Sequence, residues 1–219
     1  MSASATVFEA IRSGDIERLR ALVAGDAALA ASRDAAGVSA VLQARYHGRA
    51  DMVEALLAAA PPLDVFEASA VGKGERVREL LAESPDRARA WSADGFTALH
   101  LAAFFAQPEI AEMLLARGAD ADVPARNPMA VRPLHSAVAA RQRDIAALLL
   151  DRGAQVDARQ QGGYTPLHAA AHNGDLTMLD LLLARGADAT LRTEDGRDAA
   201  DLAREKGHEA VLGRLEQRR

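Results

Sequence analysis

The chain has 219 residues, a formal net charge of −5 and no cysteine. The net negative charge argues against a nucleic-acid partner, because neutralising phosphates needs clustered Lys and Arg. The absence of cysteine excludes disulfides, thiolate nucleophiles and cysteine-ligated zinc. Alanine supplies 51 residues and aromatic residues only 4%, which favours thin, closely packed helices over a β-sandwich.

No apolar run approaches the ~18 residues that a bilayer-spanning helix needs. Residues 1–14 have no basic segment before an apolar one, and Glu9 interrupts them, so they do not resemble a secretory signal. We therefore expect a soluble protein in the cytoplasm, with no membrane partner.

The first third of the chain repeats itself with an offset of 58 residues. The tetrapeptide Val-Phe-Glu-Ala stands at 7–10 and again at 65–68, and several later residues recur at the same offset. Two adjacent units, one cap-like and one fuller, therefore occur twice. We expect Phe8 and Phe66 in the core, at the position that a histidine holds in the later units.

From residue 97 onward, a Leu-His pair recurs in three segments. They read Thr-Ala-Leu-His-Leu-Ala-Ala at 97–103, Arg-Pro-Leu-His-Ser-Ala-Val at 132–138 and Thr-Pro-Leu-His-Ala-Ala-Ala at 165–171. Thr as a cap and Pro in the first turn start a short helix. A second, Leu-rich stretch then ends at Arg-Gly-Ala, where Gly supplies the left-handed residue that closes a helix. Each segment predicts two helices joined by a turn.

The predicted turns within the units show where the period is broken. Their spacings are 34, 24, 34, 35, 33 and 33 residues, and a period of this length indicates a solenoid. The short step falls at 58–64, where Pro61 and Pro62 leave too few residues for a hairpin loop. We expect a local change in curvature there. The turns are placed at Gly14, Gly48, Gly72, Ala106, Arg141, Gly174 and Gly207.

We thus predict an all-α solenoid of about seven helix-turn-helix units, with hairpin loops (called fingers below) between them. The finger between units two and three should be missing. We expect the chain to form one domain over 1–219. The units lie near 2–33, 34–63, 64–91, 92–126, 127–159, 160–192 and 193–219.

This pattern resembles the ankyrin repeat over nearly the whole chain, most strongly from 92 to 192. Residues 34–42 look like a degenerate unit without the histidine, and in the last unit Asp198 and Asp201 replace the Thr and the His. The resemblance implies that the recurring histidines are structural residues. It also implies a non-enzymatic module that binds proteins through its finger tips and the exposed face of the first helix of each unit.

The recurring histidines, His100, His135 and His168, could also be considered for catalysis. Their recurrence at the repeat period indicates a structural role, because catalysis needs one constellation and not a copy in each unit. His168 and His172 have the spacing of a zinc-binding pair, but Ala169 replaces the Glu that follows the first His in the His-Glu-x-x-His motif.

We therefore predict no enzyme activity, no catalytic or metal-binding residue and no cofactor. A small-molecule or metal-dependent enzyme remains an alternative of a different class. It would require a deep pocket with carboxylates or histidines of perturbed pKa, and a ligand or metal bound among His47, His172 and Asp175 would favour it.

The aromatic residues are informative because there are only eight. In the repeat frame, most of them fall on or beside the concave surface, and a finger with Met and Val extends the patch. Aromatic side chains with a polar rim are typical of protein-binding hot spots. The predicted partner-binding residues are Tyr46, Trp91, Phe96, Phe104, Phe105, Met129, Val131, Tyr164, His172 and Asn173.

Local packing is the alternative for some of these residues. Phe104 and Phe105 are adjacent, so only one of them can point fully outward from a helix, and Trp91 could pack over the loop at 84–90.

The favoured function is a protein–protein interaction scaffold that binds a protein partner, without nucleic acid, as a monomer. A narrower alternative is a regulatory or inhibitory subunit of an intracellular enzyme or toxin. Only two residues are Lys, and this Arg-rich, Ala-rich usage predicts a bacterial source.

Overall fold

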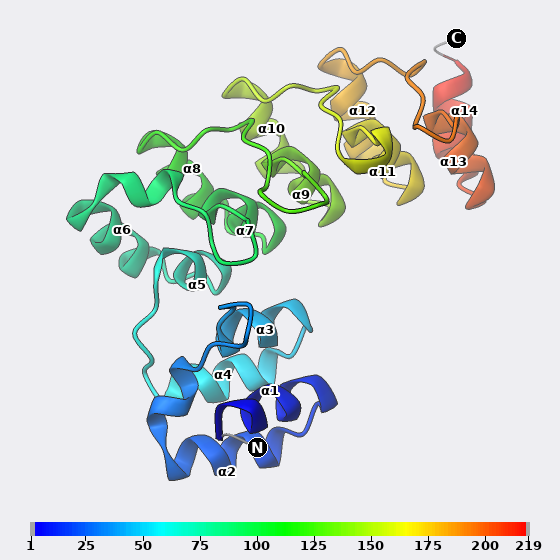
Figure 1. Ribbon diagram of the computed structural model, residues 1–219. Helices are drawn as coiled ribbons and strands as arrows, with labels where there is room; N and C mark the ends of the chain where they lie inside the picture. The colour runs from blue at the N-terminus through cyan, green and yellow to red at the C-terminus, as the bar shows by residue number, and fades with distance from the viewer. Residues whose placement is uncertain (1–2, 218–219) are drawn as a thin grey trace.

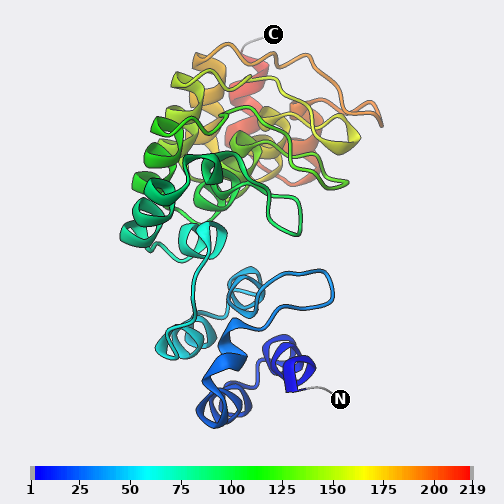
Figure 2. The ribbon, with the colours of Figure 1, turned by 60° about the vertical axis from the view of Figure 1, so that its left-hand side comes forward.

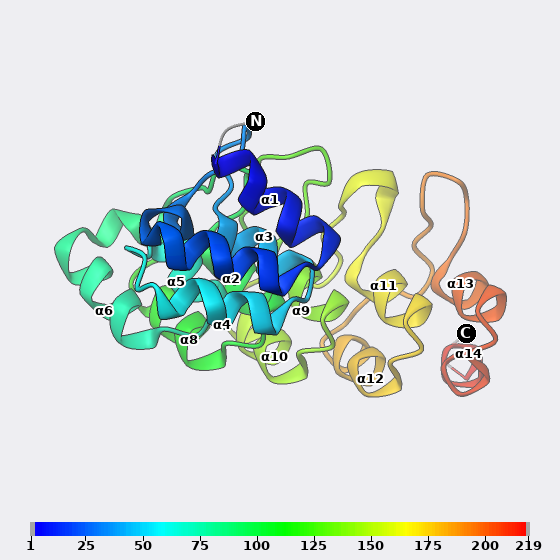
Figure 3. The ribbon, with the colours of Figure 1, turned by 90° about the horizontal axis from the view of Figure 1, so that it is seen from below.

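The computed structural model describes residues 3–217 and contains fourteen α-helices and no β-strand within them. The helices form seven consecutive antiparallel pairs, which we number repeats 1 to 7 (Figure 1). The prediction of an all-α solenoid is confirmed. Figure 3 shows the two rows of helices most clearly at α11 to α14.

The first helices of the pairs make up the inner row. They are α1 (Ala3–Ser13), α3 (Ala40–Tyr46), α5 (Val65–Ala70), α7 (Ala98–Phe104), α9 (Pro133–Ala139), α11 (Pro166–His172) and α13 (Ala199–Glu205).

The second helices make up the outer row. They are α2 (Ile16–Gly25), α4 (Ala50–Ala58), α6 (Gly74–Glu83), α8 (Pro108–Ala116), α10 (Arg143–Asp151), α12 (Leu176–Ala184) and α14 (Glu209–Glu216). Three 3-10 turns, η1 (Ala27–Ala31), η2 (Pro85–Arg89) and η3 (Gln161–Gly163), lie in the connections.

Capping explains where the inner helices begin. In α7 the Thr97 hydroxyl accepts from the His100 N–H, and His100 Nδ1 accepts from the Thr97 N–H at 3.2 Å. Thr165 and His168 form the same reciprocal cap in α11, and Asp198 and Asp201 form it in α13. Each side-chain cap stabilises a helix by about 1 kcal/mol. The recurring Thr and His therefore start helices.

One predicted register is wrong. In α5 the position of the histidine is held by Glu67, whose carboxylate accepts from the Asp64 N–H at 2.8 Å. Phe66 lies one residue earlier and is half-buried against the core. Phe8 is buried, as expected. The offset of 58 residues aligns the two cap-like units correctly with each other. Their alignment with the later units, however, was shifted by one residue.

All seven predicted turn residues have a positive φ. Five are glycines, which adopt this left-handed conformation without a steric penalty. The other two are Ala106 (φ 59°) and Arg141 (φ 58°), where a Cβ makes the conformation unfavourable. The repeat period therefore imposes the turn geometry even where the residue type opposes it.

We expect Ala106→Gly to stabilise the protein by about 0.5–1 kcal/mol, because Ala106 is exposed and glycine removes the left-handed penalty. The free energy of unfolding in urea measures this. Ala82→Gly, at an exposed position within α6, is the matched control and should destabilise by a similar amount. If both substitutions destabilise equally, the turn is not strained.

The fingers project from one side of the stack (Figure 2). In repeats 4 to 7 they are joined by backbone hydrogen bonds: Arg126 N donates to Gly95 O (2.8 Å), Gln161 N to Met129 O (3.0 Å) and Glu194 N to Gly162 O (2.9 Å). These bonds fix the finger tips relative to one another.

The stack is interrupted between repeats 2 and 3. Residues 59–64 run directly from α4 to α5 without a hairpin, and the outer helices α4 and α6 do not pack closely. One core cluster spans repeats 1 and 2, a second spans repeats 3 to 7, and a small third cluster joins them. The missing finger therefore divides the solenoid into a short and a long part.

Candidate functional site

An apolar groove of about 500 Å³ lies between the fingers and the inner helices of repeats 4 and 5. Its lining includes five of the ten predicted partner-binding residues, which come from three different repeats. They are Tyr46, Phe96, Phe104, Met129 and Val131.

The rest of the lining was not predicted. It consists of buried residues of α7 and α9, the exposed Ala139 and one finger residue: His100, Leu101, His135, Ser136, Ala139 and Gln160. Tyr46 and Phe104 each lie four residues after the histidine position of their repeat, and Ala139 holds the same position in repeat 5. The small side chain of Ala139 leaves space for the groove, and no aromatic residue marks it in the sequence.

The groove contains most of the large exposed apolar side chains of the described residues. Among the described residues, four large hydrophobic side chains are exposed: Tyr46 (37%), Phe104 (44%), Met129 (47%) and Leu176 (36%). The first three line the groove, and Leu176 lies elsewhere, in α12. Apolar side chains clustered in one concave place mark binding sites more strongly than scattered ones.

Tyr46 is held in place by a contact with a distant repeat. Its hydroxyl donates to Asp94 Oδ2 at 2.7 Å, and Asp94 belongs to the finger of repeat 4. Burial, together with the neighbouring Asp94 carboxylate, raises the pKa of Tyr46 well above its ordinary value. The side chain is therefore a neutral phenol that donates a hydrogen bond.

Phe105 does not belong to the exposed patch, and its prediction is corrected. It is 8% exposed and packs in the small third cluster. Its ring contacts Tyr46 (5.9 Å between centroids) and the edge of Phe104 (5.1 Å), and the Arg45 guanidinium lies 4.6 Å from its centre. Because adjacent residues at a helix end point in different directions, Phe104 faces the groove and Phe105 supports it from below.

Trp91 and Tyr164 are also outside the groove. Trp91 is half-buried beneath the Arg126 guanidinium, which lies 3.4 Å from the ring centre. The Tyr164 hydroxyl accepts a hydrogen bond from Arg197 at 2.7 Å, and its ring meets the edge of His168. Both rings are occupied by contacts within the stack.

His172 and Asn173 lie at the end of α11, in repeat 6, and do not line the groove. The His172 carbonyl accepts from His208 Nε2 at 3.0 Å, and the Asn173 carbonyl accepts from Arg141. The structure therefore does not bring this polar pair together with the aromatic residues.

The two groove histidines are neutral near pH 7. Burial lowers the pKa of His100 and of His135 to about 4. His100 Nε2 also contacts the Val131 carbonyl at 3.0 Å, which ties α7 to the finger of repeat 5. Within residues 3–217, no three His, Asp or Glu side chains gather as a metal site.

Sequence models of ankyrin repeats match the chain over 7–127, 65–160 and 149–203. The protein therefore belongs to the ankyrin-repeat family, whose members generally mediate protein–protein interaction.

Similar segments occur in two notch proteins. The human neurogenic locus notch homolog protein 4 is 47% identical over 72 residues, which are 32% of this chain and 4% of that protein. The Xenopus tropicalis neurogenic locus notch homolog protein 1 is 44% identical over 72 residues, or 32% of this chain and 3% of that protein. Both sources are vertebrates, so these matches do not support the predicted bacterial origin. No helix among the described residues is long and apolar enough to cross a membrane.

Proposed function

We propose that this protein is a non-enzymatic interaction module that binds a segment of a protein partner in the groove between repeats 4 and 5. The observation that carries the proposal is the convergence of Tyr46, Phe104 and Met129 on one cavity. They are three of the four large hydrophobic side chains that are exposed among residues 3–217.

The lining indicates the chemistry of the partner. The side chains of the groove are mainly apolar and aromatic, and its two histidines are neutral at pH 7. A volume of about 500 Å³ exceeds that of a single side chain and falls in the usual range of binding pockets. A partner segment that inserts two or more apolar side chains fits this space.

The remaining features of the proposal follow from composition and the repeat pattern. The chain acts as one ankyrin-repeat domain and as a monomer in the cytoplasm. Its partner is a protein, not nucleic acid, since the net charge is −5. Inhibition of an enzyme or toxin is a narrower role that no groove residue favours.

The test is a peptide library displayed on phage and selected on the wild-type protein. We expect the selected peptides to share closely spaced apolar residues. Phe104→Glu and Met129→Glu should each weaken their binding at least tenfold, because burying such a side chain contributes about 1.5–3 kcal/mol. Isothermal titration calorimetry measures the affinities.

Leu176→Glu is the matched control, since Leu176 is also an exposed apolar residue but lies outside the groove. This variant should bind the peptides as tightly as the wild type. All variants should keep the helical circular dichroism of the wild type. Equal binding by wild type and Phe104→Glu would contradict the proposal.

A further inference from the structure

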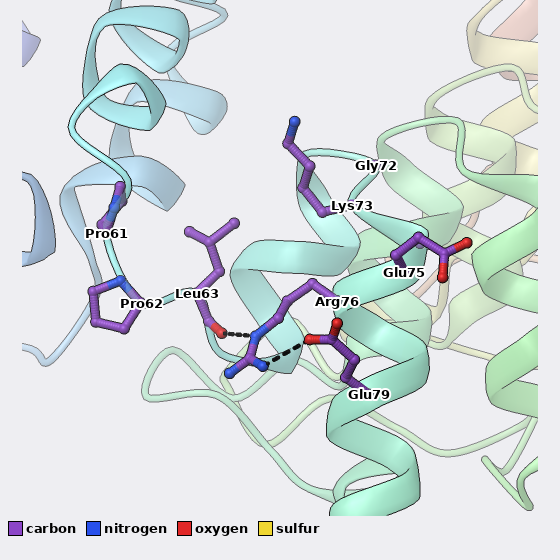
Figure 4. Close-up of a pocket in the computed structure, with 9 residues that line it drawn as sticks. Pro61, Pro62, Leu63, Gly72, Lys73, Glu75, Arg76 and Glu79 are labelled. Atoms are coloured by element: carbon purple, nitrogen blue, oxygen red, sulfur yellow. Dashed lines mark hydrogen bonds and ion pairs between the residues drawn. The ribbon is translucent and has the colours of Figure 1, made fainter.

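The joint between repeats 2 and 3 is built differently from the other repeat interfaces. The linker passes through Pro61 and Pro62, and a cavity of about 540 Å³ separates it from the beginning of α6 (Figure 4). From α6, Arg76 Nε donates to the Leu63 carbonyl of the linker at 3.2 Å, and the Arg76 guanidinium also pairs with Glu79 one turn further along the same helix at 3.0 Å. The outer row of helices is therefore open at this one place, and the joint depends on the inner row and the fingers.

Few contacts hold the joint closed. The partly buried Leu63 and Val71 pack against the core cluster of repeats 1 and 2. Val38 and Leu42 of repeat 2 pack with Ala70, Leu101 and Phe105 of repeats 3 and 4 in the third cluster. This cluster is much smaller than the core clusters on either side. Interfaces with little buried apolar surface open at the lowest free energy.

Arg45 bridges the joint from its buried side. Its Nε donates to the Ala70 carbonyl at 3.0 Å, its Nη2 lies 3.5 Å from the Phe105 carbonyl, and its guanidinium stacks on the Phe105 ring. All three contacts lie across the joint, so they form only when the two parts are together.

Two polar links close the finger side. Arg33 contacts Asp64 (3.0 Å) and Glu67 (3.1 Å) at the start of α5. Tyr46 donates to Asp94, in repeat 4. Because repeat 3 has no finger, the finger of repeat 2 lies against that of repeat 4, where a Cβ on Gly37 would be 3.0 Å from the Ala93 Cβ.

Tyr46 connects this joint to the groove. Among the described residues that line the groove, Tyr46 comes from repeat 2, whereas the others belong to repeats 4 to 6. Opening the joint would withdraw Tyr46 from the groove and remove part of its wall.

We propose that repeats 1 and 2 form an arm that opens and closes about residues 59–64, and that the closed position completes the groove. Partner binding and arm closure are then reciprocally coupled, because a ligand that prefers the closed state shifts the equilibrium toward it. The coupling rests on the proposed function, whereas the movement of the arm does not.

Distance measurement by electron paramagnetic resonance tests the movement. The chain has no cysteine, so Glu54→Cys in α4 and Glu109→Cys in α8, both exposed, carry the only spin labels. Arg45→Ala combined with Tyr46→Phe removes contacts across the joint and leaves both cores intact. We expect a second, longer distance in at least a tenth of the variant molecules. Tyr46→Phe alone should change the distribution in the same direction.

The control pair, Glu109→Cys with Glu209→Cys, lies wholly within repeats 4 to 7 and should give the same distance in both backgrounds. Distributions across the joint that are identical in wild type and double variant would overturn the movement. This measurement uses no partner, so it stays readable if the proposed function fails.

The coupling is tested with a peptide selected on the groove. Adding it to the spin-labelled double variant should reduce the longer-distance population at least threefold, and the double variant should bind it at least threefold more weakly than the wild type. A peptide that binds both proteins equally and leaves the distances unchanged would overturn the coupling while supporting the proposed function.

Discussion

Gly95→Ala should lower the free energy of unfolding by about 3 kcal/mol, whereas Gly196→Ala should lower it by only about 1 kcal/mol. Both glycines lie in finger turns with nearly the same backbone (φ 84° and 85°), so the left-handed penalty of about 1–2 kcal/mol is common to both. A Cβ on Gly95 would lie 2.5 Å from the Arg126 carbonyl oxygen, whereas one on Gly196 meets nothing within 4 Å. The difference between the two variants isolates the packing of neighbouring fingers.

Urea unfolding followed by circular dichroism measures both values. The clash would also push apart the fingers of repeats 4 and 5, which are joined at this point by the hydrogen bond from Arg126 N to Gly95 O. Gly95→Ala should therefore weaken groove binding as well as stability. Equal destabilisation by Gly95→Ala and Gly196→Ala would show that the packing of neighbouring fingers does not require a residue without a Cβ at position 95.

The protein should lose stability steeply as the pH falls from 6.5 to 4. The pKa of His100 and that of His135 are lowered to about 4 in the folded protein, first by burial and then by neighbouring positive charge. In the unfolded chain both should titrate near 6.5. Between these values the unfolded state binds more protons, so protonation favours unfolding. Each histidine contributes a loss of about 3 kcal/mol, at about 1.4 kcal/mol per pH unit.

The double variant His100→Gln with His135→Gln provides the control. Glutamine does not titrate, and it can still accept the hydrogen bond from the N–H at the start of the helix. Its unfolding free energy should change much less between pH 6.5 and 4 than that of the wild type. We expect a smaller slope to remain, because burial also lowers the pKa of His168 and of His172. If the double variant keeps the full wild-type slope, other groups control the acid sensitivity.

Most of the fold could be predicted from the repeat period in the sequence. The period located the turn between the two helices of each of the seven repeats, including the turns at Ala106 and Arg141, because the stack imposes the same positive-φ backbone on each unit. It also located the missing finger at 58–64. The position within the repeat correctly predicted that Tyr46 and Phe104 are exposed, because residues four positions after the histidine position face the concave side.

The surroundings of a side chain could not be predicted where its contact partner lies far away in the sequence. Trp91 is covered by Arg126, and Tyr164 is bonded to Arg197, 33 residues further on. These contacts depend on how neighbouring fingers pack, and the sequence of a single repeat does not determine that packing. The contact between repeat 2 and repeat 4 could not be predicted either, because it joins repeats that are not neighbours in the chain.

The most direct test of the groove uses the five methionines of the chain as probes. Met129 is exposed in the groove, whereas Met52 and Met178 are fully buried in the two cores. In a protein labelled with ¹³C at the methionine methyl groups, a bound groove peptide should shift the Met129 signal and leave those of Met52 and Met178 in place. Saturating binding that does not move the Met129 signal would contradict the account.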